Sequence, residues 1–265
     1  MISFNWFVHN WQLVSTMINN PLFFGILLLT MLLQGNNDFK NKQLKYQRVK
    51  KAYNEKYTKI KSLLATKGID NSKFLLYIRI FKKEEVMEVW VKGNAHSDYK
   101  HLIDYPFCAN SGSAGPKRKS GDLQIPEGFY FIDRFNPVSN FHLSLGINYP
   151  NESDRILGYK NNLGGDIFLH GGCATIGCVP ITDDKIKSLY ILAVESKSNG
   201  QSKIPVHIFP GRAMKHGDWE KLSGTASQGL TTFWKNLKPG FDYFEKNHLI
   251  PIVKVRRNGE YYLSQ

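Results

Sequence analysis

The segment from Ile167 to Pro180 carries the side chains best suited to covalent chemistry. Its sequence is IFLHGGCATIGCVP, in which an apolar run leads to His170, small residues follow, and Gly177-Cys178 comes near the end. A thiolate is a strong nucleophile, and a neighbouring histidine can take the thiol proton and later give one to a leaving amine. A histidine or a helix N-terminus also lowers the thiol pKa below its free value of about 8.5. The pattern therefore predicts Cys178 as nucleophile and His170 as its base.

The loop around this cysteine is predicted to supply the backbone of the site. Gly177 leaves room for a substrate carbonyl, and backbone N–H groups here could hold the oxyanion of acyl transfer. Gly171 and Thr175 belong to the same loop. Thr182 is expected to be the N-cap of a following helix, which would bring a positive dipole end near the thiol.

Other uses of the same residues remain open at this point. The chain has three cysteines, Cys108, Cys173 and Cys178, so at most one internal disulfide forms and at least one thiol is left over. His170, Cys173 and Cys178 could instead bind zinc, with Cys108 or His142 as a fourth ligand. A Cys173–Cys178 disulfide, or inert core cysteines with Cys173 as a small buried residue, are the further alternatives.

Composition indicates a globular protein with a strongly basic surface. The chain has 265 residues, 42% of them hydrophobic and 22% charged, and a formal net charge of +13. Such a charge attracts polyanions. Much of it lies between residues 40 and 61, which we interpret as the solvated face of a helix just outside a membrane. No nucleic-acid-binding motif accompanies it, so nucleic acid is not an expected partner.

The N-terminus has the character of an export or anchor segment. Residues 1–37 contain no Lys, Arg, Asp or Glu, and residues 21–33 form an almost unbroken apolar run. That length suits a signal-peptide core better than a full span of about 20 apolar residues. A buried core helix is the alternative. We expect residues 1–39 to be a signal or anchor segment, and the protein to be exported.

Patterning then divides the remaining chain. A four-, four-, three- and four-residue apolar spacing predicts a basic amphipathic helix within residues 40–69. A mostly β domain is expected over residues 70–212, with a hairpin from 74–81 and 86–91, further strands at 128–132, 141–147, 167–170 and 206–209, and a helix after Thr182. Residues 111–128 read as a long exposed loop, in which Lys117 and Lys119 are solvated. Residues 213–265 are expected to form a helical appendage.

The run His170-Gly171 followed by Thr175-Ile176-Gly177-Cys178 resembles the signature of the YkuD-type L,D-transpeptidase domain. The resemblance covers roughly residues 70–210 and extends in particular to the YafK-like branch of that family. Further matching pieces are 115–122, 126–128, 136–144 and 149–154. Two departures stand out: Ile176 replaces a frequent histidine, and Val179-Pro180-Ile181 replaces a region that often holds an arginine.

The resemblance implies a β sandwich or barrel-like catalytic domain, with added helices at both ends and an α+β fold overall. It assigns Cys178 and His170 the catalytic roles, with a thioester formed at the D-centre of a diaminopimelate-type stem residue of peptidoglycan. His142 and Lys119 are candidates for substrate binding. No cofactor or metal is expected. The expected location is the periplasm or cell envelope, and the expected partners are stem peptides and wall-linked protein. An amidase acting on the same bond and a non-catalytic wall-binding module are the alternatives.

Overall fold

The computed structural model describes residues 38–71, 73–214, 224 and 226–264. The predicted signal or anchor segment therefore lies almost entirely outside the described residues. Within them, no helix is long and apolar enough to cross a bilayer. The elements follow the chain as α3 Gln47–Ala65, β1 Phe74–Phe81, β2 Val86–Gly93, β3 Lys100–Pro106, β4 Gly128–Asn136, β5 Ser144–Ile147, α4 Glu152–Leu157, β6 Phe168–His170, β7 Val179–Pro180, α5 Thr182–Ser198, β8 Ile204–Phe209, the 3-10 turn η1 Arg212–Met214, α7 Gln228–Asn247, β9 Val253–Val255 and β10 Tyr261–Leu263.

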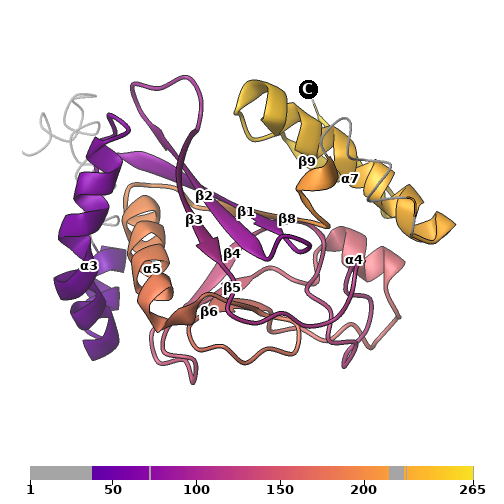
Figure 1. The fold of residues 1–265 in the computed structure, drawn as a ribbon, viewed down its shortest axis with the longest axis horizontal. Helices are drawn as coiled ribbons and strands as arrows, with labels where there is room; N and C mark the ends of the chain where they lie inside the picture. The colour runs from indigo at the N-terminus through magenta and orange to yellow at the C-terminus, as the bar shows by residue number, and fades with distance from the viewer. Residues whose placement is uncertain (1–37, 72, 215–223, 225, 265) are drawn as a thin grey trace, which may run out of the picture.

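One curled sheet forms the centre of the protein, with helices on both sides (Figure 1). Its strand order is β3-β2-β1-β8-β4-β5-β6-β7. The β1–β8 and β6–β7 pairs are parallel, and the other pairs are antiparallel. The prediction of a mostly β domain with added helices, α+β overall, is confirmed.

The predicted strands are largely in place, with two differences. The hairpin β1–β2 and strands β4, β6 and β8 match the sequence expectation. Strand β3 was missed. The strand predicted from residue 141 begins only at Ser144, because His142 has a left-handed backbone with φ of 69° that interrupts extended pairing.

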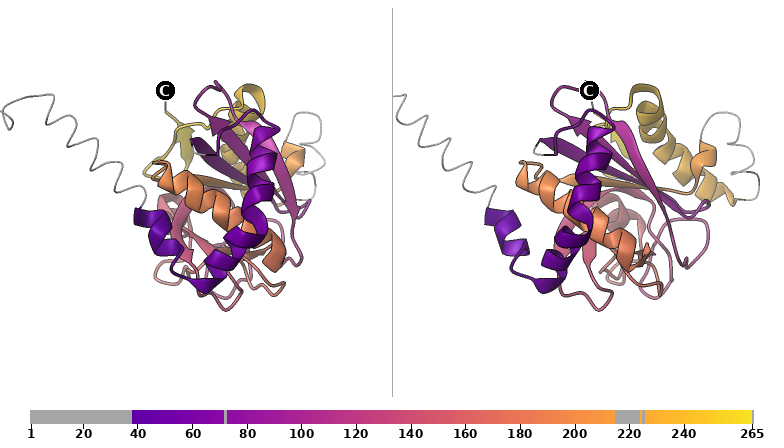
Figure 2. Two further views of the ribbon diagram at one scale, coloured as in Figure 1. Left: turned by 90° about the vertical axis from the view of Figure 1, so that its left-hand side faces the viewer. Right: turned by 60° about the vertical axis from the view of Figure 1, so that its left-hand side comes forward.

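Helices α3 and α5 cover one face of the sheet, with α5 between α3 and the strands (Figure 2). The buried side of α3 consists of Val49, Ala52, Ile60 and Leu64, which join the main core cluster. This confirms the amphipathic helix. Its basic side is more than a solvated face, because Lys56 pairs with Asp184 of α5. Glu55 of α3 likewise accepts from Lys187 of α5 at 2.6 Å.

Helix α7 covers the opposite face and packs with its own aromatic cluster. Trp234, Leu237 and Phe241 are buried against Phe81 and Phe209 of the sheet. The expectation of a purely helical appendage is incomplete, because the chain ends in the hairpin β9–β10. Short strands after a long helix, without a strong alternating pattern, gave no clear sequence signal.

Candidate active site

Two rows of residues paired across neighbouring strands place the candidate catalytic side chains. One row pairs Ser144 of β5 with Asn136 of β4 and with His170 of β6. The other pairs Gly146 with Arg134 and Phe168. Side chains two residues apart on a strand share a face, so the rows are neighbours on one side of the sheet. They border a cavity of about 450 Å³ that is lined by Asn136, Ser139, Asn140, Phe141, Ser144, Asp166, Phe168, His170, Ala174, Thr175, Ile176 and Cys178.

The Cys178 thiol extends the second row. It precedes β7, and its sulfur accepts a hydrogen bond from the Phe168 N–H at 3.4 Å. The thiol itself donates to the Asp166 carbonyl at 3.6 Å. Burial raises the thiol pKa, and the charge of Asp166 raises it further. The hydrogen bond from the Phe168 N–H and the charge of Lys117 lower the pKa, but by less. Cys178 is therefore a protonated thiol at neutral pH, contrary to the sequence expectation of a lowered pKa.

His170 is buried at the end of β6 and held in one tautomer. Its Nδ1 bonds the Gly171 carbonyl, which can only accept, so Nδ1 carries the proton and Nε2 has a free lone pair. The Phe141 ring packs on the imidazole with centroids 4.5 Å apart. Burial lowers the pKa of His170, so the imidazole is neutral at pH 7 and able to act as a base. Both groups line one cavity, although no hydrogen bond joins His170 to Cys178 among the described residues.

Thr175 braces the loop that carries the thiol. Its hydroxyl donates to the Cys178 carbonyl at 2.8 Å and accepts from the Gly177 N–H at 3.2 Å. Gly177 has φ of +131°, and a Cβ there would lie 3.0 Å from the Gln124 carbonyl, so this position requires glycine. Because Thr175 occupies the Gly177 N–H, that group is not free to serve an oxyanion in this arrangement.

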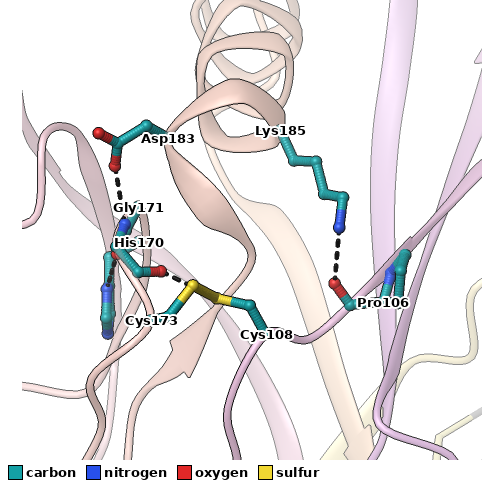
Figure 3. Close-up of a disulfide and its surroundings, with 8 residues drawn as sticks. Pro106, Cys108, His170, Gly171, Cys173, Asp183 and Lys185 are labelled. Carbon is teal, nitrogen blue, oxygen red and sulfur yellow. Dashed lines mark hydrogen bonds between the residues drawn. A yellow bond between two sulfur atoms is a disulfide. The ribbon is translucent and has the colours of Figure 1, made fainter.

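A disulfide fastens the other end of the same loop (Figure 3). Cys108 and Cys173 are bonded, and Cys178 is the free cysteine of the described chain. The alternative of a Cys173–Cys178 disulfide is therefore wrong. The alternative of Cys173 as a small buried residue is also wrong, because Cys173 is exposed. A zinc site that includes Cys173 loses that ligand because its sulfur is bonded to carbon and to Cys108. The pairing of residues 65 positions apart gave no sequence signal.

The start of α5 lies beside this disulfide. Thr182 is the first helical residue, whereas Ile181 holds the N-cap position and makes no side-chain capping bond. The predicted Thr182 cap is wrong. Asp183 instead accepts the Gly172 N–H at 2.7 Å, which ties the helix to the catalytic loop (Figure 3). The thiol's hydrogen-bond partners in the described structure belong to the Asp166–Phe168 segment and not to this helix end.

The segment before β4 is exposed at residues 112–114 and 119–121, as predicted, whereas other parts of it are buried. Lys117 is buried and pairs with Asp122 at 2.6 Å, so its predicted solvation is wrong. Lys119 is exposed and lies outside the cavity lining, with its ammonium 5.8 Å from the Tyr159 ring centroid. The Gln124 carbonyl borders the space that a Cβ at Gly177 would need. The sequence showed only turn-forming residues here, which do not distinguish a packed loop from a solvated one.

Glu127 connects this segment to the rest of the fold. Its side chain is fully buried and receives Lys82 at 3.0 Å. It also accepts the Gly115 N–H at 2.9 Å and the Trp234 indole N–H at 2.7 Å. A single carboxylate thus connects the end of β1, helix α7 and the segment that supports Gly177.

Arg48 of α3 holds the opposite wall of the cavity. Its guanidinium donates to the carbonyls of Ser139 and His142, on either side of the Phe141 ring that packs on His170. The His142 side chain does not line the cavity, and its Nε2 is buried without a partner in the described structure. Sequence reasoning missed Arg48, because a long-range bond from a basic helix has no local pattern.

This arrangement suits acyl transfer. It combines a neutral histidine and a free thiol in one cavity, and a nucleophile with a base near it is the combination that nucleophilic catalysis uses. Among the described residues, no cluster of three or more His, Cys, Asp or Glu side chains could hold a metal ion.

Comparison with known proteins identifies the family of this chain. Residues 76–208 match the family model of the YkuD L,D-transpeptidase catalytic domain. The chain is 34% identical over 192 residues to the "Putative L,D-transpeptidase YafK" of Escherichia coli K12, covering 72% of this chain and 74% of the relative. The same figures hold for the O157:H7 protein of that name.

Solved structures with a similar fold have lower sequence identity to this chain. The helical cell shape determining protein Pgp2 of Campylobacter jejuni has a TM-score of 0.42 and 17% identity, covering 74% of this chain and 80% of that one. Its K307A mutant has a TM-score of 0.43 and 18% identity, covering 68% of this chain and 63% of that chain.

Proposed function

Because the chain belongs to the family of YkuD L,D-transpeptidase catalytic domains, we propose that it is a cysteine acyltransferase of peptidoglycan that works through a Cys178 thioester. The observation that carries the proposal is that a neutral His170, with Nε2 unprotonated, and the free Cys178 thiol line one cavity. The relationship to the YafK proteins supports the same assignment.

The first half-reaction acylates the cysteine. His170 Nε2 takes the thiol proton as the sulfur attacks an amide carbonyl of a diaminopimelate-type stem residue, and a C–S bond forms. The C–N bond then breaks, and the leaving amine receives the proton from His170. The thiol must first leave its bond to the Asp166 carbonyl and turn toward the imidazole. Because the thiol pKa is raised, the thiol is protonated at rest, and His170 has to accept its proton before or during the attack.

The second half-reaction resolves the thioester. Attack by the amine of a second stem peptide gives transpeptidation, and attack by water gives an amidase that releases peptide or wall-linked protein. His170 takes the proton of either nucleophile, and the sulfur leaves as the thiol. Backbone N–H groups of the Thr175–Cys178 loop are the proposed oxyanion donors, for which Gly177 would have to exchange its bond to Thr175.

Location and partners follow from the substrate. We propose that the protein acts in the periplasm or cell envelope on stem peptides, after export through its N-terminal segment. Lys119 and His142 lie outside the cavity lining, so a substrate contact by either would involve the part of a peptide outside the cavity.

Product analysis tests the proposal. The full-length protein is incubated with a tetrapeptide stem donor, with and without a second stem peptide as acceptor, and products are identified by liquid chromatography and mass spectrometry. A cross-linked product that requires acceptor indicates transfer, and free shortened donor indicates hydrolysis. Cys178→Ala should abolish both. Binding of the peptides without any turnover, by a protein that is folded, would instead favour a wall-binding module.

A further inference from the structure

A carboxylate at the start of α5 lies one peptide unit away from the candidate base. Asp183 Oδ1 accepts the Gly172 N–H at 2.7 Å. The other side of the same peptide unit is the Gly171 carbonyl, which bonds His170 Nδ1 (Figure 3). Asp183, this peptide and the imidazole therefore form a continuous chain of two hydrogen bonds.

The two hydrogen bonds reinforce each other. An N–H that donates to a charged acceptor makes a stronger bond than one that donates to a neutral acceptor. It also polarises its own peptide, so that the carbonyl on the other side becomes a better acceptor. The Gly171 carbonyl in turn determines that Nδ1 of His170 carries the proton and that Nε2 has the free lone pair. The carboxylate therefore favours the tautomer that can act as a base toward the cavity.

The backbone at both ends of this chain is adapted to the contact. Thr182, directly before Asp183, has φ of 73°, a left-handed conformation that is an outlier for a β-branched residue. Backbone strain of this kind is concentrated at functional sites. A Cβ at Gly171 would collide with Asp183 Oδ1 and with the Phe141 carbonyl. The carboxylate can therefore approach this peptide only because residue 171 is glycine.

Helix stability alone does not account for the position of this carboxylate. Acidic side chains in the first turn of a helix interact favourably with its dipole, and α5 has two, Asp183 and Asp184. Asp184 pairs with Lys56 of α3. Asp183 instead bonds the loop between His170 and Cys178. The two neighbouring acids therefore make different contacts, and it is Asp183 that reaches the peptide bonded to His170.

We infer that Asp183 is a positioning residue for the general base, because it holds His170 in the Nδ1–H tautomer through the Gly171–Gly172 peptide. The inference rests on the proposed function, which makes His170 the base. In a catalytic triad the carboxylate bonds the imidazole directly, whereas here a peptide unit lies between the two groups. Asp183 is not part of the cavity lining. Its loss should therefore slow acylation of Cys178 without weakening peptide binding.

The tautomer of His170 tests the inference without any substrate. Full-length protein labelled with ¹⁵N at histidine is studied by NMR in detergent at slightly alkaline pH, and His170→Gln identifies the His170 signals. The unmodified protein should show the Nδ1–H tautomer. Asp183→Ala should show a mixture of both tautomers, whereas Asp183→Asn, which keeps an oxygen acceptor, should retain Nδ1–H. Asp184→Ala is the matched control and should resemble the unmodified protein.

The rate of Cys178 acylation by a stem-peptide donor, followed by intact mass, is the second readout. At saturating donor the rate in Asp183→Ala should fall about 10- to 100-fold, the value of a hydrogen bond to a charged group, with an unchanged half-saturating concentration. In Asp183→Asn the rate should fall about fivefold or less, because a neutral acceptor replaces a charged one. Asp184→Ala should keep the full rate. Asp183→Ser, whose hydroxyl ends one bond short of the Gly172 N–H, should behave as Asp183→Ala and replaces it if alanine prevents folding.

Three results would overturn the inference. They are a His170 proton on Nε2 in the unmodified protein, an unchanged Nδ1–H tautomer in Asp183→Ala or Asp183→Ser, and an equal change in Asp184→Ala. A lower acylation rate that is explained entirely by weaker donor binding would also count against a positioning role. If the unmodified protein forms no adduct on Cys178, the proposed function fails, whereas the tautomer measurements still decide whether Asp183 positions His170.

Discussion

Replacing Glu127 by alanine should destabilise the protein severely, although this residue lies outside the cavity. The change leaves the Lys82 ammonium, which is 6% exposed, without its carboxylate partner. It also removes the acceptor of the Gly115 and Trp234 N–H groups. Breaking a buried ion pair by removing one partner costs about 3–5 kcal/mol, because the remaining charge stays desolvated. With a urea m-value near the upper end for small proteins, about 3 kcal/mol/M, the unfolding midpoint should fall by roughly 1–1.7 M.

Urea unfolding followed by tryptophan fluorescence and circular dichroism measures this shift. Trp234→Phe removes one of the three hydrogen bonds, which is made to a charged group, and should cost about 1.5–3 kcal/mol for that bond, less than the loss of the carboxylate. Glu260→Ala, at an exposed position, should stay within about 0.5 kcal/mol of the unmodified protein. Where Glu127→Ala still folds, its acylation rate should also fall, since Gln124 no longer supports Gly177 firmly. A midpoint shift no larger than that of Glu260→Ala would mean that the buried Glu127 contacts contribute little to stability.

Three further predictions concern the cavity and its supports. Arg48→Gln should lower kcat/KM roughly tenfold, the value of about one charged hydrogen bond, because the Ser139 and His142 carbonyls lose their donor. Lys50→Gln, at an exposed position of the same helix, is the control. Equal activity of the two variants would count against a positioning role for Arg48. The double change Cys108→Ser and Cys173→Ser should lower the free energy of unfolding by about 2–4 kcal/mol, measured by thermal unfolding. Cys178 should still become acylated in this variant. A loss of acylation as complete as in Cys178→Ala would show that the disulfide is required for the reaction. Burial lowers the pKa of His170, so kcat/KM should decline only below pH 6.5, where His170 becomes protonated. Burial also raises the pKa of the Cys178 thiol, so the rate of alkylation by iodoacetamide should keep rising with pH beyond the usual thiol range. A plateau of the alkylation rate near neutral pH would contradict a protonated resting thiol.

Local signals in the sequence were sufficient for the elements with strong periodicity. Helix α3 and the β1–β2 hairpin were predicted because apolar residues recur at helical and at strand spacing. The juxtaposition of His170 and Cys178 was also predictable, since one strand end and one short loop carry both residues. Parallel pairing of β6 with β7 then brings the loop back beside the strand.

What the sequence did not reveal depends on contacts between distant segments. The Cys108–Cys173 bond, the Arg48 contacts and the burial of Glu127 each join residues that local patterns leave unrelated. The direction of the Cys178 pKa shift was wrong for a similar reason. Proximity to a histidine and a helix in the sequence favours a thiolate, whereas burial in the folded protein disfavours its charge.

Intact-mass spectrometry of the full-length protein during reaction with a stem-peptide donor shows whether Cys178 becomes acylated. We expect a transient adduct equal to the donor acyl group, located on Cys178 by peptide mapping and absent from Cys178→Ala. In His170→Ala the adduct should form about 10²–10⁴ times more slowly, with comparable peptide binding, because only the general base is lost. Turnover without an adduct on Cys178 would exclude it as the nucleophile, and equally fast acylation in His170→Ala would exclude His170 as the base.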